Sequence, residues 1–335
     1  MLSMSLLNVS DESDNLSRTC EESRLYGLEY SNRNLETVLR YILIGFLGLQ
    51  LPIALILNAF MIFLILKFRH LRNITFFLAL QLLLIDLLYT VFSTPITIIS
   101  AASGKWVMGL PFCSLTGFLL TIDWQMRSIL MFVIVCDRFC TVFMPFKYPR
   151  IRRKVIIPLN ISAVLVTVIT ALIPVALDCT DFNRIAWYCT PQNGCKNPDA
   201  CQLVLIVLGP LSNVIGSYVP LVMYIIMFIK ARKTQNQISS GTLESEEFLI
   251  RKKKERKANV TFLLLFLALF GVTAVPFLFY ITSGPFIGEQ TLDAYILPRY
   301  IFRLVFSLLP IVDPIAIMRN QEVRKALKLL RNMFK

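Results

Sequence analysis

Charged side chains interrupt one long apolar stretch of the sequence. Residues 119–143 read LLTIDWQMRSILMFVIVCDRFCTVF, in which Asp123 and Arg127 lie four residues apart and Asp137 directly precedes Arg138. A charge at the centre of a bilayer costs roughly 2.5–3.5 kcal/mol even on insertion scales. Residues four apart share one face of a helix, so Asp123 and Arg127 can pair. These charges are therefore the first candidates for a functional role.

Seven apolar segments could position such charges inside a membrane. The chain has 335 residues, of which 56% are hydrophobic and 16% charged, which is too apolar for a soluble protein of this size. Segments long enough to cross about 30 Å of hydrocarbon are Tyr41–Leu66, Ile74–Ile99, Pro111–Phe143, Val155–Leu177, Leu203–Ile229, Val260–Ile281 and Ala294–Ile317. We predict an all-α membrane protein, a seven-transmembrane helix bundle with an amphipathic eighth helix. Its expected parts are an amino-terminal segment (1–37), the bundle (38–318) and a tail helix (319–335).

Basic residues gather in the segments that follow the first, third, fifth and seventh of these helices. The stretch 230–257 holds nine Lys and Arg and 319–335 holds six, whereas residues 1–40 carry four Arg against seven acidic residues. Because basic loops stay cytoplasmic, we expect the amino end outside the cell and the carboxyl end inside. The net charge of +13 would then face anionic inner-leaflet lipid and an acidic or helical protein partner. We expect no nucleic-acid partner.

The cysteines divide by the same topology. Cys136 and Cys140 lie toward the reducing inner side, and the other six lie on the outer side, where disulfides form: Cys20, Cys113, Cys179, Cys189, Cys195 and Cys201. They predict a cross-linked outer loop between helices four and five, and the spacing leaves their pairing open. The acceptor motifs at Asn8 and Asn15 would face the same side and could carry glycans.

Several short motifs accompany the charges of the third helix. CDRFC ends this helix, Cys113 stands 25 residues before Arg138, and GKWVMG places Trp106 seven residues before Cys113. Further matches are LNAF around Asn58, LALQLLLID ending at Asp86, and the prolines Pro220, Pro276 and Pro314. Together these motifs resemble the rhodopsin-like (class A) G protein-coupled receptors over about residues 38–335. The tail MRNQEVRKAL is similar to odorant-type receptors, and the subfamily stays open.

The resemblance implies a disulfide between Cys113 and Cys189 and a switch at the inner end of the third helix. In the family, the acidic residue holds the arginine at rest, and outward movement of helix six frees the arginine for a heterotrimeric G protein. The residues that this implies for coupling and activation are Asp137, Arg138, Phe139, Pro145, Phe146, Phe270, Pro276, Asp313 and Pro314. The alternative is that charges at a helix end reach the interface without a functional role.

Arg127 stands eleven residues before Arg138, where the family usually has a small polar residue that faces a sodium ion beside the helix-two aspartate. We hypothesise that the Arg127 guanidinium takes the place of this ion and bridges Asp86 and Asp313 through its directional donors. Such a receptor would be insensitive to sodium. The alternative is a local Asp123–Arg127 pair that neutralises itself and does nothing else.

The outer halves of helices three, five, six and seven are expected to form the ligand cavity, with Leu120, Trp124, Tyr280, Arg299 and Arg303 as candidate contacts. Amine-binding relatives usually have an aspartate where this chain has Leu120, so monoamines are disfavoured. Helix seven has no lysine for a retinal Schiff base, which argues against an opsin. Arg303 would suit an anionic ligand group. Pairing of Arg303 with Glu289, Asp293 or Asp178 is the alternative.

The chain also departs from the family pattern. Helix four lacks the usual tryptophan, Ala274 replaces an aromatic residue, Phe228 and Ile317 replace tyrosines, and Asp313 replaces an asparagine. We therefore predict a plasma-membrane receptor that binds an extracellular ligand and activates a G protein, with a non-coupling or arrestin-biased receptor as the alternative. A transporter is less favoured, because matching interrupted repeats are not apparent. We expect no enzyme, catalytic residue, cofactor or metal; the only histidine is His70.

Overall fold

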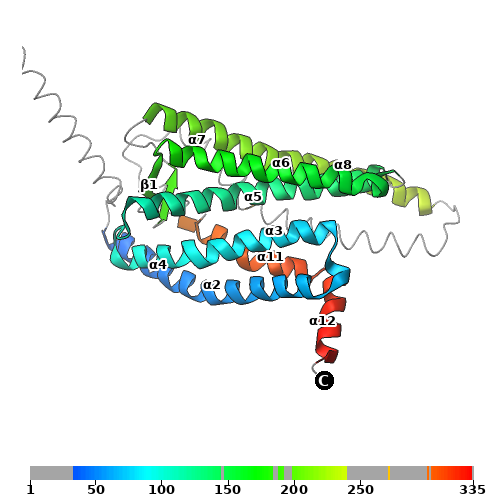
Figure 1. Ribbon diagram of the computed structural model, residues 1–335, viewed down its shortest axis with the longest axis horizontal. Helices are drawn as coiled ribbons and strands as arrows, with labels where there is room; N and C mark the ends of the chain where they lie inside the picture. Colours follow the sequence, from blue (N-terminus) through cyan, green and yellow to red (C-terminus); the bar gives the residue numbers. More distant parts are fainter. Residues whose placement is uncertain are drawn as a thin grey trace, which may run out of the picture.

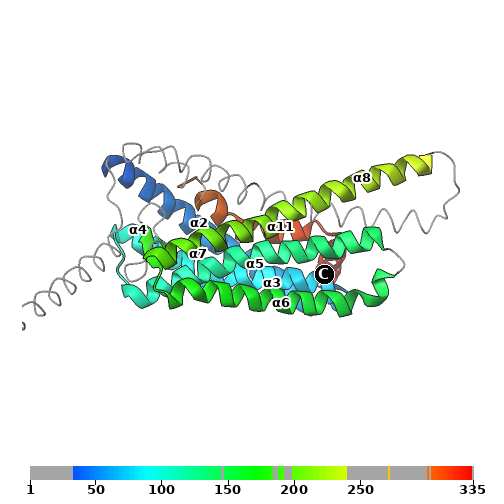
Figure 2. The same ribbon diagram turned by 90° about the horizontal axis from the view of Figure 1, so that it is seen from above.

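A computed structural model describes residues 33–144, 147–183, 188–191, 198–239, 271, 300–301 and 303–333. Its long helices lie side by side in an elongated bundle (Figures 1 and 2). They are α2 (Arg33–Lys67), α3 (Ile74–Leu88), α4 (Thr94–Ser103), α5 (Gly109–Phe143), α6 (Tyr148–Ala176), α7 (Pro198–Asn213), α8 (Val219–Ser239), α11 (Leu309–Met318) and α12 (Gln321–Met333). A hairpin of β1 (Thr180–Asn183) and antiparallel β2 (Tyr188–Pro191) lies at one end of the bundle, and α12 lies at the other.

Within the described residues, four stretches are long and apolar enough to cross a membrane: Leu35–Lys67, Ile74–Ser103, Gly109–Phe143 and Tyr148–Ala176. They correspond to the first four predicted helices. The first and fourth begin earlier than predicted, because their first turns are polar and were not part of the apolar runs. The predicted helix Val260–Ile281 lies outside the described residues except Gly271, and the seventh predicted helix is described only from Tyr300 onward.

Two of the predicted helices contain a wider π-helical turn. Tyr89–Ser93 separates α3 from α4, and Val214–Tyr218 separates α7 from α8. Proline lacks the N–H that a helix needs, and each π turn comes just before a proline, Pro95 or Pro220. The hydroxyl of Thr97 donates to the Ser93 carbonyl at 2.8 Å and satisfies one of the acceptors near the first turn. The apolar pattern predicts the helices but not these interruptions.

Apolar packing is concentrated in two clusters. The larger cluster joins α2, α3, α5, α11 and α12 through buried residues that include Leu64, Leu82, Leu130, Leu309 and Val323. The smaller one lies at the hairpin end and includes Leu43, Trp106, Phe182 and Tyr300. Many large apolar side chains on the outside of the helices are exposed, which suits a surface in contact with lipid rather than water.

A buried asparagine connects α2 to α11. Asn58 Nδ2 donates to the Ala54 carbonyl at 2.8 Å and to the Pro310 carbonyl at 2.7 Å. In a regular helix the Pro310 carbonyl would accept from the N–H of residue 314, but residue 314 is a proline and has none. The Asn58 amide supplies the missing donor, which matters in a membrane because unsatisfied backbone groups are costly there.

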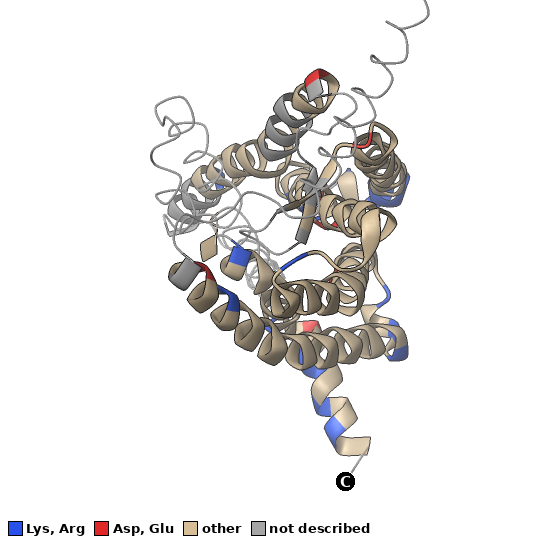
Figure 3. Cartoon of the chain, turned by 90° about the vertical axis from the view of Figure 1, so that its left-hand side faces the viewer, with Lys and Arg blue, Asp and Glu red and all other residues tan. Residues whose placement is uncertain are grey.

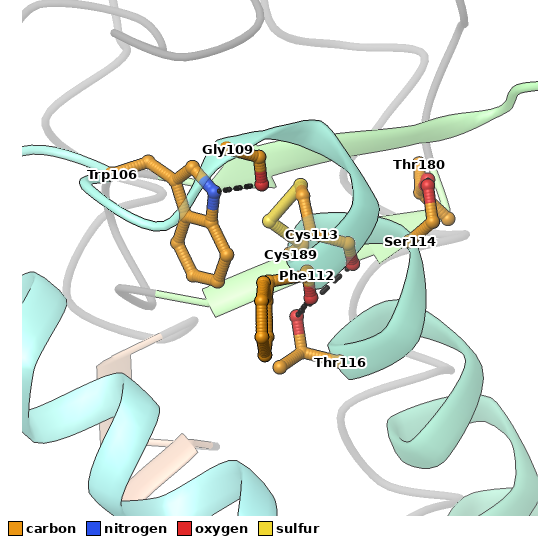
Figure 4. Close-up of a disulfide and its surroundings, with 8 residues drawn as sticks. All are labelled: Trp106, Gly109, Phe112, Cys113, Ser114, Thr116, Thr180 and Cys189. Carbon is orange, nitrogen blue, oxygen red and sulfur yellow. Dashed lines mark hydrogen bonds between the residues drawn. A yellow bond between two sulfur atoms is a disulfide. The ribbon is translucent and has the colours of Figure 1, made fainter.

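Two disulfides hold the hairpin end together. Cys113 at the start of α5 bonds to Cys189 of β2, which confirms the predicted pair, and Cys179 bonds to Cys201 of α7. Trp106 packs on Phe182 of β1. Its Nε1 donates to the Gly109 carbonyl at 2.7 Å, close to the Cys113–Cys189 disulfide (Figure 4). The predicted residues Asn8, Asn15, Cys20 and Cys195 lie outside the described residues.

The tail forms the predicted amphipathic helix, which spans Gln321–Met333 and leaves the bundle at an angle (Figure 1). Val323 and Ala326 are buried against the bundle, whereas Arg324, Lys325 and other polar residues are exposed. Seen along the bundle, α12 carries Lys and Arg on its outer surface (Figure 3). A helix with one apolar and one basic side suits the surface of an anionic membrane.

Candidate functional site

The guanidinium of Arg127 contacts three carboxylates inside the bundle. Its Nε donates to both oxygens of Asp123, at 3.2 and 3.3 Å, and its Nη1 and Nη2 donate to Asp313 and Asp86. Arg127 is 2% exposed, and each of the three aspartates is at most 4% exposed. The structure thus brings together all four residues of the charge network predicted from sequence.

Three helices supply this network. Asp86 is on α3, Asp123 and Arg127 are on α5, and Asp313 is on α11. A guanidinium has five donors in one plane, so it can bind several carboxylates at once, which a lysine ammonium does less well. The local Asp123–Arg127 pair and the contacts across to Asp86 and Asp313 are therefore both present, and they join α3, α5 and α11.

The network contains more carboxylates than cations. One guanidinium faces three carboxylates, and Oδ2 of Asp86 is buried with no hydrogen-bond partner among the described residues. The described part of the chain contains no group of three or more His, Cys, Asp or Glu side chains arranged to hold a metal ion. The Arg127 guanidinium supplies positive charge to all three carboxylates.

An aromatic group lies next to the network. The ring of Phe306 stacks on Trp124 with centroids 5.4 Å apart and meets Tyr89 edge to face at 6.4 Å. Arg127 lies 5.9 Å from the Phe306 centroid, within the range of a cation–π contact. The side chains of Trp124, Phe306 and Tyr89 therefore connect the Arg127 network to the region around Arg303.

Arg303 is the second buried arginine, with 1% of its surface exposed. Its Nη1 donates to the Tyr89 hydroxyl at 2.5 Å, and its guanidinium lies 5.8 Å from the centre of the Tyr89 ring. Tyr89 belongs to the π-helical turn, which the apolar pattern does not predict, so this partner of Arg303 could not be predicted. Of the other predicted ligand contacts, Leu120 is partly buried and packs against the core, and Trp124 stacks on Phe306. Tyr280 and Arg299 lie outside the described residues, and so do Glu289 and Asp293, two of the alternative partners for Arg303.

The α12 end of α5 carries Asp137 and Arg138. The Asp137 carboxylate lies 3.7 Å from Nε of Arg138, but Arg152 of α6 donates to it twice, at 2.7 and 2.6 Å. The Tyr148 hydroxyl donates to the same carboxylate at 2.9 Å. The resemblance implied only Arg138 as a partner for Asp137. Arg152 and Tyr148 were missed because the chain reverses between α5 and α6, and spacing along the sequence does not show which basic residue returns.

The other residues expected to take part in coupling are only partly described. Phe139 stacks on Phe143 with centroids 4.3 Å apart, and Lys230 of α8 lies 3.8 Å from the Phe143 centroid. Pro314 follows Asp313 within α11. The remaining expected residues, Pro145, Phe146, Phe270 and Pro276, lie outside the described residues.

Residues 57–316 match the sequence model of the family described as "7 transmembrane receptor (rhodopsin family)". The chain belongs to this family. It is therefore a multi-pass membrane protein of a receptor family rather than an enzyme, and the expected seven-helix fold is confirmed. The family assignment agrees with the resemblance seen in the sequence.

Individual receptors match at low identity. The chain is 25% identical to the human histamine H2 receptor over 195 residues, which cover 58% of this chain and 53% of that receptor. It is 31% identical to neuropeptide FF receptor 2 of Mus musculus over 90 residues, which cover 27% of this chain and 22% of that receptor. It is 23% identical to the alpha-1A adrenergic receptor of Oryzias latipes over 221 residues, which cover 64% of this chain and 43% of that receptor. The chain spans about half the length, or less, of these curated relatives.

Proposed function

We propose that this protein is a plasma-membrane receptor that binds an extracellular ligand and activates a heterotrimeric G protein. The observation that carries the proposal is the family match over residues 57–316. The distribution of basic segments supports an orientation with the hairpin end of the bundle outside the cell and the α12 end inside. Arg138 and the exposed basic side of α12 then lie where a G protein and anionic inner-leaflet lipid would meet the receptor.

The test of this function is nucleotide exchange on a panel of G proteins, with acids, peptides and volatile organic compounds screened as ligands. We expect at least one ligand to stimulate exchange by the wild-type receptor, and Arg138→Ala to abolish the stimulation while the protein remains folded in the membrane. Exchange that is equally strong in wild type and Arg138→Ala would contradict the proposed role of Arg138. Arg319→Ala, an exposed residue beyond α11, is a control for the loss of one positive charge.

A second candidate function is a receptor that binds ligand without activating a G protein. Phe228 stands where the family often has a tyrosine and is 57% exposed on the outside of α8. Ile317 stands in place of the tyrosine of the family's motif in helix seven, and it is buried and apolar. Neither side chain has a hydroxyl for Arg138 or for a water beside it. If a ligand binds with a measurable affinity and no G protein responds, this second function is favoured.

The ligand proposal rests on Leu120 and Arg303. Two of the relatives are named as histamine and adrenergic receptors, but amine-binding members of the family usually have an aspartate where this chain has Leu120. Arg303 offers a buried guanidinium, already positioned by the Tyr89 hydroxyl, which suits an anionic group. We therefore propose an anionic ligand. Binding of an acid identified in the screen should weaken strongly in Arg303→Ala and less in Arg303→Lys; binding unchanged by both would contradict the proposal.

We also propose that Arg127 serves as a built-in cation where relatives of the family hold sodium. Its support is the contact of one guanidinium with carboxylates from three helices. A covalently attached cation does not dissociate, so the charge of the network is always partly compensated. The receptor should therefore respond to its ligand equally in sodium and potassium buffers.

A further inference from the structure

Asp137 is held mainly by α6 and not by its neighbour in the sequence. Arg152 binds both carboxylate oxygens, with Nε to Oδ1 at 2.7 Å and Nη2 to Oδ2 at 2.6 Å. A guanidinium that binds both oxygens of a carboxylate forms one of the strongest charge-assisted contacts in proteins. The Tyr148 hydroxyl adds a third hydrogen bond to Oδ1, and the carboxylate is only 2% exposed.

Arg138 makes a longer contact with Asp137 than Arg152 does. Its Nε lies 3.7 Å from Oδ2, which is an ion pair at long range, and its Nη2 donates instead to the Thr75 hydroxyl at 2.7 Å. Arg152 donates to the same hydroxyl at 2.8 Å. A hydroxyl oxygen has two acceptor lone pairs, so Thr75 can accept from both arginines. The two guanidinium groups thus meet at one carboxylate and one hydroxyl, and Arg152 makes the closer contacts with the carboxylate.

Resting on the proposed coupling function, we propose that Arg152 is a positioning residue that draws Asp137 away from Arg138 and so leaves Arg138 more available to a G protein. Arg152 therefore opposes the resting pair that the family resemblance implies. An arginine that competes for Asp137 raises the activity of the receptor without ligand, whereas Asp137 itself lowers it. Substitution of Arg152 should therefore lower the activity of the receptor without ligand, and substitution of Asp137 should raise it.

The neighbouring basic residues separate this role from a general effect of positive charge. Arg150, Arg153 and Lys154 are exposed, whereas the Arg152 side chain is 27% exposed and reaches inward to Asp137. All four contribute equally to an inner membrane surface rich in basic residues. Arg153→Gln therefore removes the same charge from the same turn of helix as Arg152→Gln and leaves the contacts of Asp137 in place, which makes it the matched control.

The first experiment measures nucleotide exchange without ligand, using full-length receptor in membranes and the panel of G proteins. Loss of one bidentate charge-assisted contact should lower exchange in Arg152→Gln by about tenfold. Asp137→Asn should raise exchange, the double variant should behave like Asp137→Asn, and Arg153→Gln should match wild type. Exchange that rises or stays unchanged in Arg152→Gln, while Asp137→Asn raises it, would overturn the proposal and leave the proposed function intact.

The second experiment does not depend on coupling. A double-mutant cycle compares the change in unfolding temperature of the double variant Asp137→Asn with Arg152→Gln to the sum of the changes in the two single variants. A parallel cycle does the same for Asp137→Asn and Arg138→Gln. The proposal predicts the larger interaction for residues 137 and 152, and an equal or larger interaction for 137 and 138 would overturn it. Arg152→Lys replaces Arg152→Gln in both experiments if the glutamine variant does not fold. If no variant changes exchange with any G protein, the coupling function fails, and this cycle still decides whether Arg152 is the principal partner.

Discussion

Arg127 contacts the carboxylate of Asp313, although the two residues lie 186 positions apart in the chain. The same guanidinium also contacts Asp86 and Asp123, so a single side chain joins α3, α5 and α11. Buried ion pairs do not in general stabilise a fold more than apolar residues would. Removal of one member, however, leaves the remaining charges buried and uncompensated, so the network is sensitive to substitution.

Arg127→Ala should lower the free energy of unfolding by about 3–5 kcal/mol, because it leaves three carboxylates without their shared partner. Thermal unfolding of the purified protein in detergent measures this. Adding Asp313→Asn removes one of the uncompensated charges, so the double variant should lose less than the sum of the two single variants. Additive losses would show that the two side chains do not interact. Lys154→Ala, an exposed basic residue, is the control and should have little effect.

Asn58→Leu should cost about 1–3 kcal/mol, because the Pro310 carbonyl would lose its side-chain donor and remain buried. Pro314→Ala restores a backbone N–H four residues after that carbonyl. The cost of Asn58→Leu should therefore be smaller in a Pro314→Ala background than in wild type, again measured by thermal unfolding. An equal cost in both backgrounds would show that Asn58 does not substitute for the missing backbone donor. Asn332→Ala on the exposed side of α12 is the control.

Gly216→Ala should destabilise the protein, since a Cβ at this position would lie 2.2 Å from the Cβ of Ser128 on α5. Overpacking of this kind typically costs about 1–3 kcal/mol. Ser128→Gly should rescue it only in part, because it removes the opposing Cβ but leaves the Ser128 Cα 2.7 Å from the added Cβ. Gly45→Ala is the matched control, because nothing lies within 4 Å of its added Cβ, and alanine is the better helix former. Equal unfolding temperatures for Gly216→Ala and Gly45→Ala would contradict a close approach of α5 to the π turn.

The long helices and the two charged pairs on α5, Asp123 with Arg127 and Asp137 with Arg138, could be predicted from the sequence. Apolar length shows which segments cross a membrane, and a charge within such a segment stands out because it is costly. The spacing of Cys113, Asp137 and Arg138 indicates the family, and the resemblance to the family implies the Cys113–Cys189 disulfide. The grouping of Arg127 with Asp86 and Asp313 was also predicted, as one of two alternatives, from the family resemblance and the position of Arg127 eleven residues before Arg138.

The partners at the helix ends and π turns could not be predicted. Tyr89, which contacts Arg303, lies in a π turn, and a periodic pattern of apolar residues does not report such a turn. Arg152 reaches Asp137 because α6 returns along α5 after a chain reversal. Five basic residues lie between 147 and 154, and their positions alone do not show which one faces the bundle.

The role of Arg127 as a built-in cation is tested most directly by the unfolding temperature of the wild-type receptor in sodium chloride and in choline chloride of equal concentration. A bound ion stabilises the folded state in proportion to the logarithm of its concentration. We predict equal unfolding temperatures in the two salts for wild type, and a higher temperature in sodium for Arg127→Ser, whose network has room and charge for an ion. A wild-type receptor that is stabilised by sodium, but not by choline, would contradict the account.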